Sequence, residues 1–366
     1  MALLAAALLD GCASLGYAVH VARGELSLLA RREPLDRAIR DPRLTEHDRA
    51  LLRQAEAARR FASDQLDLPR NRSYTTFVAL DRPYVTWNVL ATREFSVEPI
   101  RHCFPLTGCV AYQGYFDEDH ARRAAKRLQE RGDDTWIEGA AAFSTLGWFA
   151  DPVLGTMLRW DADTLDRMIF HELAHQEYYL AGDTTFNESF ASFVGRQGLC
   201  EWHRVRGVPD AIDDSGAFDT AFARRVLDLR DELAAIYAQR KPPGDLRAGK
   251  QAAIESFRAA YAPWRDHDWP GHHRYDAWVA GPINNAKLLP FGLYEQWIPA
   301  FAQMFRDADG QWRRFYDEVA ATGALSAAAR DARLLALADQ GIDERAPVAT
   351  MATCRGIAGS SEVRGR

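Results

Sequence analysis

The spacing of apolar side chains changes along this chain and separates a mixed first part from a helical second part. Residues 34–66 carry apolar positions at helical spacing and predict two helices. Between positions 75 and 110 the pattern changes to short β-branched and aromatic runs broken by Pro and Arg. These runs predict strands over 77–80, 84–89 and 95–97.

A further helix and strand are expected next. The helix covers 117–131, with Asp117 as its N-cap and Gly132 as its stop. The strand covers 135–139, where β-branched and aromatic residues recur.

The remainder of the chain is predicted to be helical. Its best-defined segment runs over 165–180 without Pro or Gly, with Asp163 placed to cap its start and Gly182 placed to end it. Further helices are predicted over 186–194, 218–240, 246–262, 285–307, 310–321 and 326–339. This order predicts an α+β fold in one domain, 13–366, with a mixed α/β lobe over 13–160 and a mainly helical lobe over 161–366.

Composition places the chain among globular proteins and argues against one class of partner. Its 366 residues are 47% hydrophobic and 26% charged, which suffices for a large core. The formal net charge of −6 argues against nucleic-acid binding, which requires a basic surface. Nothing in the sequence indicates an obligate protein partner.

The first twelve residues resemble an export signal. Ala2 to Leu9 is an unbroken run of Ala and Leu, too short to span a bilayer but typical of a signal-peptide core. Asp10-Gly11-Cys12 follows, as in a bacterial lipobox, although Asp10 is atypical and no Lys or Arg precedes the run. We expect residues 1–12 to end in a lipid-bearing Cys12 that anchors the protein on the periplasmic side. The alternative is an ordinary N-terminal helix.

The remaining cysteines fit an oxidising compartment. Cys103 and Cys109 are close enough in sequence to close a small loop by a disulfide. Free buried thiols, as in a cytoplasmic metalloprotein, are the alternative.

A metal-binding motif lies within the predicted 165–180 helix. His171 and His175 are four residues apart and therefore lie on one helix face, one turn apart. Two imidazoles at this spacing are typical zinc ligands. Glu172 lies at the edge of the same face, where a general base could reach a water on the metal.

The third ligand must come from outside this helix. Ala181 and Tyr178 exclude the metzincin pattern, which needs a third His and a Gly at these positions. Glu177 points away from the His face, and Asp183 and Glu188 remain candidates.

Glu188 completes a set of two His and one carboxylate and is preferred. Its competing interpretation is a capping box with Thr185, in which Glu188 would reach back to the Thr185 amide.

The segment Asn187-Glu188-Ser189-Phe190-Ala191 after His171–His175 resembles the gluzincin metallopeptidases. Over nearly its whole length the chain is similar to a family of predicted bacterial aminopeptidase lipoproteins. The matching segments are Gly11-Cys12-Ala13-Ser14-Leu15-Gly16-Tyr17, Cys103-Phe104-Pro105, Gly108-Cys109, Tyr112, Gly114-Tyr115-Phe116, Ser144-Thr145-Leu146-Gly147-Trp148-Phe149 and Asn284-Asn285-Ala286. The resemblance implies a zincin-like metallopeptidase fold and one zinc ion. Ser192 stands where thermolysin-like proteins carry an Asp.

Other site residues are less sharply indicated. A peptidase needs a hydrogen-bond donor for the oxyanion. Tyr275 and His273 are preferred as catalytic residues, and His272, Tyr112 and Tyr115 are alternatives.

An aminopeptidase also needs a carboxylate that pairs with the substrate's free amine. Glu138 and Asp151 are among the candidates, and the sequence does not choose between them. The strand near 135–143 is suited to pairing with an extended peptide. Asn284 and Asn285 are expected either to face the site or to hold local backbone.

These observations predict a zinc-dependent aminopeptidase of the bacterial envelope that acts on peptides. Two alternatives stay open for an exported protein: an envelope endopeptidase, and an inactive zinc-containing lipoprotein that binds peptides.

Overall fold

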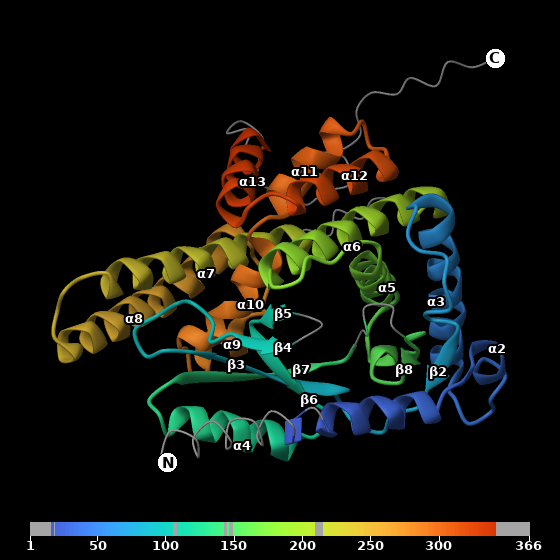
Figure 1. Cartoon of the computed structure of the whole chain (residues 1–366), viewed down its shortest axis with the longest axis horizontal. Coiled ribbons are helices and arrows are strands. Elements are labelled where there is room, and N and C mark those ends of the chain that lie inside the picture. The colour runs from blue at the N-terminus through green and yellow to red at the C-terminus, as the bar shows by residue number, and fades with distance from the viewer. Residues whose placement is uncertain are drawn as a thin grey trace, which may run out of the picture.

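The computed structural model describes residues 16–17, 19–104, 108–142, 145, 149–208 and 215–341. The expected signal segment and the predicted lipid-bearing Cys12 lie outside these residues. Figure 1 shows the small strands, α4 (Glu118–Gln129) and the first helical segment on one side of the molecule and a larger array of helices on the other.

The strands of the first part form two three-stranded sheets and a hairpin. One sheet has the order β1 (Glu33–Pro34), β2 (Thr76–Val78), β8 (Val153–Leu154). The other has the order β6 (Tyr112–Tyr115), β3 (Thr86–Thr92), β7 (Asp134–Ala140), with β3 antiparallel to both neighbours. The hairpin consists of β4 (His102–Phe104) and β5 (Gly108–Val110).

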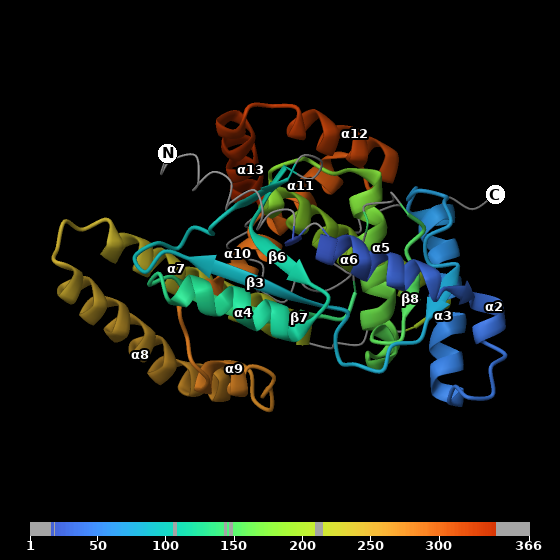
Figure 2. The same cartoon turned by 60° about the horizontal axis from the view of Figure 1, so that its bottom comes forward.

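The β6-β3-β7 sheet presents different side chains on its two faces, as alternation along a strand requires. Trp87, Val89 and Tyr115 pack against helix α4 (Glu118–Gln129) on one face. Figure 2 shows α4 lying along this sheet. On the opposite face, Leu90 and Tyr112 pack with residues of helix α10 (Asn285–Glu295). The second face is therefore turned towards the helical part.

Helices dominate the rest of the described chain. Residues 19–30 are helical, and none of the described helices is long and apolar enough to cross a membrane. The other helices, in chain order, are α2 (Leu35–Ala38), α3 (Glu46–Gln65), the 3₁₀ turn η1 (Met157–Arg159), α5 (Ala162–Glu177), α6 (Thr184–Arg206), α7 (Ser215–Tyr237), α8 (Pro243–Asp268), α9 (Asp276–Ala280), α11 (Ile298–Asp307), α12 (Trp312–Gly323) and α13 (Ala327–Gly341).

The largest hydrophobic core surrounds α5 and α6. Phe170 from α5, Phe190 from α6 and Phe315 from α12 are fully buried within it, together with residues of α3, α11 and the small β1-β2-β8 sheet. A second core joins α7, α8, α9 and α10 around Phe222. The central pair of helices is therefore enclosed by packing on several sides.

The α+β class is confirmed, and most predicted elements are present with shifted ends. The predicted strand over 95–97 is absent, since these residues form turns and bends. The helix predicted over 285–307 is two helices, α10 and α11. Pro299 in the first turn of α11 has no N–H to donate to the preceding turn, which is consistent with a break there.

The N-cap of helix α5 lies two residues earlier than expected. Asp161 is its N-cap and accepts a hydrogen bond from the Thr164 amide at 2.7 Å, whereas the predicted cap, Asp163, bonds His203 at 2.9 Å. The helix ends at Glu177 because Tyr178 is extended, so the predicted end at 180 is wrong.

A buried acid in α5 couples folding to pH. Asp166 is fully buried and accepts hydrogen bonds from Trp202 and Gln54 through Oδ2, while its Oδ1 is buried with no partner among the described residues. Burial raises the pKa of this carboxyl to about 7. A raised pKa in the folded state means that folding favours the proton-bound acid. The protonated carboxyl group of Asp166 therefore contributes fully to the free energy of unfolding below the unfolded pKa of about 4. This contribution is lost as pH rises through about 7.

We therefore expect Asp166→Asn to flatten the pH dependence of stability. Between pH 5 and pH 8, urea denaturation should show the free energy of unfolding of the wild type falling by about 1–3 kcal/mol relative to the variant. Asp331→Asn, at an exposed position on α13, serves as the control and should follow the wild type. Identical pH profiles for Asp166→Asn and the wild type would contradict this assignment.

Candidate metal centre

Helix α5 supplies two imidazoles that point to one place. His171 and His175 lie one turn apart, and their Nε2 atoms are 3.2 Å from each other. Both residues are buried, with exposed fractions of 6%.

Helix α6 supplies the third group through a tightly held turn. Asn187 both accepts from the Leu180 amide and donates to the Leu180 carbonyl, each at 2.8 Å. Asp183 caps α6 by accepting from the Phe186 amide and forms an ion pair with Arg330 on α13. These contacts fix the first turn of α6, and with it Glu188, beside α5.

Two glycines let α6 approach α5 closely. A Cβ atom at Gly195 would lie 2.8 Å from the carbonyl oxygen of Arg167 and 3.4 Å from Cβ of His171. A Cβ atom at Gly198 would lie 3.0 Å from the ring of Phe170. Contacts below about 3 Å force neighbouring atoms to move, so the helix spacing depends on these positions lacking a side chain.

The result is a compact set of three potential metal ligands. Oε2 of Glu188 lies 3.3 Å from Nε2 of His171 and 3.4 Å from Nε2 of His175. One ligand atom from each residue falls within 4.8 Å of the others, and all three residues are buried. Three electron-pair donors that converge in a buried site are best satisfied by a cation between them. This group could therefore bind one metal ion.

The charges of the site favour such a cation. Burial opposes ionisation of Glu188, but His175 and His171 outweigh it and hold its pKa at about 2. Burial lowers the pKa of His171, whereas at His175 the attraction of Glu188 overcomes burial and raises the pKa. Glu188 is thus a buried anion at neutral pH.

Glu172 follows the first histidine and lies at the same site. Glu172 is buried, and its charge raises the pKa of His175. Burial raises the pKa of Tyr74, Tyr112 and Tyr294, and the charge of Glu172 raises these pKa values further. Its carboxylate therefore lies among an imidazole and several phenols.

Three half-buried tyrosines surround the ligand group. The Tyr294 ring lies 6.2 Å from that of His171, and the Tyr179 ring lies 6.4 Å from that of His175. Tyr112 faces the group from β6, and its pKa is raised by burial and then by Glu188. Tyr112 was an alternative in the sequence analysis, whereas Tyr179 and Tyr294 were missed. Tyr179 could have been found from the sequence, because it lies one turn after His175. Nothing near Tyr294 in the sequence indicates that it lies at this site.

The preferred oxyanion donors lie in another part of the structure. Tyr275 stacks on Phe222 in the α7–α10 core, and its hydroxyl bonds Asp219 at 3.0 Å. His273 is exposed and pairs with Asp276, while His272 packs on Phe218. The structure does not bring Tyr275 or His273 together with the three ligands, and their catalytic role stays a prediction that this geometry does not support.

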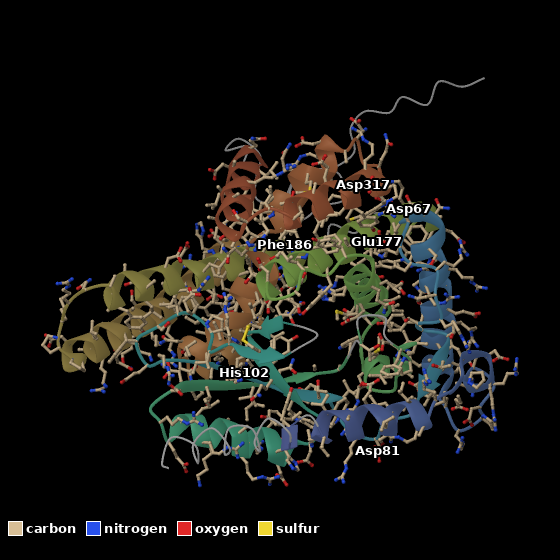
Figure 3. All side chains as sticks on the ribbon, viewed as in Figure 1. Asp67, Asp81, His102, Glu177, Phe186 and Asp317 are labelled. Atoms are coloured by element: carbon tan, nitrogen blue, oxygen red, sulfur yellow. A yellow bond between two sulfur atoms is a disulfide. The ribbon has the colours of Figure 1, made fainter. Side chains whose placement is uncertain are left out.

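The other acidic residues near the motif have partners elsewhere. Glu177 forms an ion pair with Arg313 on α12, and Figure 3 shows it beside the helices rather than the sheet. Asp183 is occupied as the α6 cap. The capping box of Thr185 with Glu188 does not form, since the N-cap is Asp183. Asn284 caps α10 by accepting from the Lys287 amide, as expected of a residue that holds local backbone.

A disulfide-linked hairpin adjoins the turn between α5 and α6. Cys103 and Cys109, the pair singled out from the sequence, are disulfide-bonded, and the bond is visible beside His102 in Figure 3. A Cβ atom at Gly108 would lie 2.6 Å from the amide nitrogen of Gly182. The hairpin thus packs closely against the segment that positions Glu188. Cys200 is disulfide-bonded as well.

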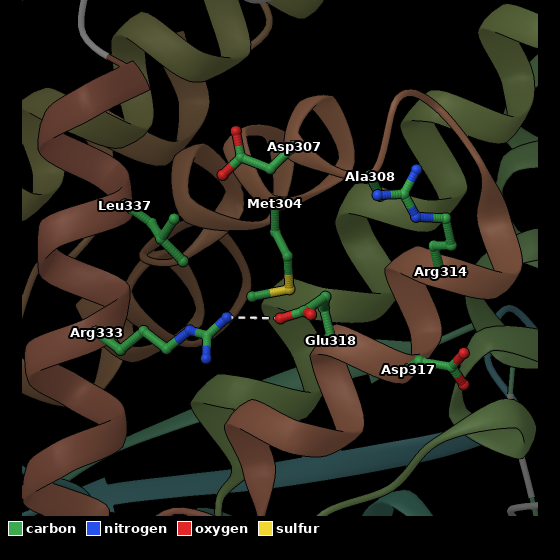
Figure 4. A pocket seen from close by; sticks show the side chains of 8 residues that line it. All are labelled: Met304, Asp307, Ala308, Arg314, Asp317, Glu318, Arg333 and Leu337. Carbon is green, nitrogen blue, oxygen red and sulfur yellow. Dashed lines mark hydrogen bonds and ion pairs between the residues drawn. The ribbon is translucent and has the colours of Figure 1, made fainter.

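A separate hollow lies among α11, α12 and α13. Figure 4 shows Met304 and Leu337 beside several charged residues in it. These charges pair with one another or with neighbours, as in Arg333–Glu318 and Arg314–Asp309, both at 2.7 Å. It shares no lining residue with the ligand group.

Comparison with known proteins identifies one family. A family model described as "Putative aminopeptidase" matches residues 16–334. No curated protein and no solved structure gave a significant match to the chain.

Removal of one ligand should abolish metal retention. We expect the wild type to hold about one metal ion per chain after dialysis against buffer, and His175→Ala to hold less than a tenth of that, measured by elemental analysis. His203→Ala, which removes an imidazole from α6 away from the site, is the matched control and should retain the metal. Equal metal content in wild type and His175→Ala would exclude this centre.

The helix spacing provides a second test. Gly195→Ala should push α6 away from α5, weaken metal binding at least tenfold and lower the thermal midpoint, because the new methyl group meets backbone at Arg167. Gly244→Ala, at a position with open space around it, should change neither quantity. Metal titration and thermal denaturation of both variants distinguish these outcomes, and unchanged affinity in Gly195→Ala would show that the spacing is not critical.

Proposed function

The chain belongs to the family described as "Putative aminopeptidase", and from this premise we propose that it is a zinc-dependent aminopeptidase with Glu172 as its general base. The observation that carries the proposal is the convergence of His171, His175 and Glu188, with Glu172 next to the first ligand. Family membership indicates a peptidase, and the site supplies a chemical basis for one.

The spacing of the ligand atoms supports zinc. Nitrogen and oxygen ligands bind zinc at about 2.0–2.1 Å, so two ligands at a tetrahedral angle lie ~3.4 Å apart. The three measured separations are 3.2, 3.3 and 3.4 Å. Two imidazoles and one carboxylate form a ligand set of catalytic zinc sites, which leave a fourth position for water.

Glu172 is placed to move protons in peptide hydrolysis. Zinc, when bound, would acidify a water molecule and polarise the scissile carbonyl group. Glu172 would take the proton of the attacking water and then deliver it to the departing amine. His171 and His175 cannot serve this purpose, because their Nε2 atoms face the metal position.

Tyr112 and Tyr294 are suited to stabilise the developing oxyanion. Burial and the nearby carboxylates raise both pKa values well above that of a free phenol. Their hydroxyl groups therefore remain protonated hydrogen-bond donors at neutral pH. Tyr112 approaches the ligand group from the sheet, and Tyr294 approaches it from α10.

We also propose an extracytoplasmic location with a lipid anchor at Cys12. The Cys103–Cys109 disulfide supports an oxidising compartment, in which such bonds persist. Peptides would then reach the enzyme in the periplasm.

Glu172→Gln provides the test of mechanism. The variant should retain about one zinc ion, since Glu172 is not a ligand, but kcat/KM on aminoacyl fluorogenic amides should fall about 100- to 10,000-fold. Glu177→Gln, on the same helix but bonded to Arg313, is the matched control and should remain active. A wild type that binds zinc but cleaves neither free nor N-acetylated peptides would favour a peptide-binding protein without activity. Activity in Glu172→Gln would exclude Glu172 as the base.

A further inference from the structure

One carboxylate near the metal centre has no evident structural role. Glu138 lies in β7, an edge strand of the β6-β3-β7 sheet as described, opposite Asn88 of β3. It is half-buried, and no described residue forms a hydrogen bond or ion pair with its side chain.

Strand alternation places Glu138 on the face of the sheet that looks towards the ligand group. Ile137 packs on the α4 side with Trp87. Trp136 packs on the other side with Tyr112 and Tyr294. Glu138 is two residues from Trp136 and therefore shares its face.

The electrostatics of Tyr294 link Glu138 to the metal centre. Burial is the largest cause of the raised pKa of Tyr294. The carboxylates of Glu188, Glu138 and Glu172 raise this pKa further. One phenol thus lies within electrostatic reach of the metal ligand, the proposed base and Glu138. These groups come from four elements: α6, α5, β7 and α10.

The other carboxylates around this face already have partners. Asp151 accepts hydrogen bonds from Thr145, and Asp134 forms an ion pair with Lys250 at 2.5 Å. Lys287, whose amino group lies over the Trp136 ring, donates to the carbonyl oxygens of Trp278 and Pro282 rather than to Glu138. Burial raises the pKa of Glu138 to about 7, as expected of a carboxylate that lacks a cationic partner.

We propose that Glu138 binds the free α-amino group of the substrate and so restricts cleavage to the N-terminal residue. This inference rests on the proposed peptidase function and assigns its exopeptidase specificity to one side chain. A primary ammonium group supplies the positive charge and the hydrogen-bond donors that Glu138 lacks within the protein.

The position of Glu138 in an edge strand suits this role. An extended peptide can add to the edge of β7 that no described strand covers. Main-chain hydrogen bonds would align its backbone with the strand. A carboxylate on the same strand would then limit how far the peptide can extend before its first amino group is bound. Asn88, directly across from Glu138, offers a neutral neighbour that does not compete for the charge.

Calorimetry on a protein that cannot turn over separates binding from catalysis. Zinc-loaded Glu172→Gln protein is titrated with L-leucinamide and with 4-methylpentanamide, which is the same molecule without the amino group. We expect L-leucinamide to bind at least tenfold more tightly. In Glu172→Gln combined with Glu138→Gln, its affinity should fall about 10- to 100-fold, while that of 4-methylpentanamide should change less than twofold.

Glu201→Gln in the same background is the matched control. It removes another half-buried carboxylate, which bonds Gln197 and Trp312 rather than the site, and should preserve the preference for L-leucinamide. Zinc content and circular dichroism establish that each variant is folded and loaded.

The outcomes separate this inference from the proposed function. If Glu138→Gln leaves the preference for the amino group intact, the assignment of Glu138 is wrong even for an active peptidase. Cleavage of N-acetylated peptides by the wild type as rapidly as free ones would also overturn it, while leaving the peptidase function in place. Absence of zinc or of any cleavage would instead contradict the proposed function.

Discussion

The close packing of α6 on α5 is the constraint on which the candidate metal centre depends. Two histidines on one helix define only a line of nitrogen atoms, and a third ligand must come within about 3.4 Å of both for a tetrahedral site. Gly195 permits this approach because any side chain there would meet the α5 backbone at Arg167. Asn187 then fixes the turn before Glu188 by two hydrogen bonds to Leu180. The carboxylate of Glu188 is therefore positioned by two features together: the close approach of the α5 and α6 backbones, and the turn that Asn187 holds by hydrogen bonds.

Such a site is costly to bury, and the surrounding structure offsets this cost in distinct ways. The two imidazoles hold Glu188 as an anion, and a bound cation would neutralise its buried negative charge. Asp183, one turn earlier, is neutralised by Arg330 of α13 and at the same time caps α6. The C-terminal helices therefore contribute to the centre without touching it, by securing the start of the helix that carries the third ligand.

The residues of the candidate centre come from two layers of the fold. In the proposed function, the helical layer supplies the metal ligands and Glu172 as general base, and the sheet supplies Tyr112 and Glu138. Helix α10 joins the two layers, since Leu289 and Leu293 pack on the sheet while Ser189 of α6 donates to the Leu293 carbonyl. In this arrangement a peptide bound along β7 would lie between the strand and the metal ligands, with its charged end near Glu138.

Much of this could be predicted from the sequence, and the limits have physical causes. Period and composition determined the α+β class, the helix that carries His171 and His175, and the spacing that makes them potential metal ligands. These features depend on local geometry alone. The choice of Asp161 over Asp163 as cap was decided by tertiary structure, since His203 from α6 bonds Asp163. From the sequence, Tyr275 was preferred as an oxyanion donor because it lies in an aromatic, polar stretch, and Tyr294 was not singled out. Only the folded chain shows that Tyr275 is committed to Asp219 and that α10 carries Tyr294 to His171. Contacts within one helix follow from its period, whereas contacts between a strand and distant helices depend on packing that no local pattern records.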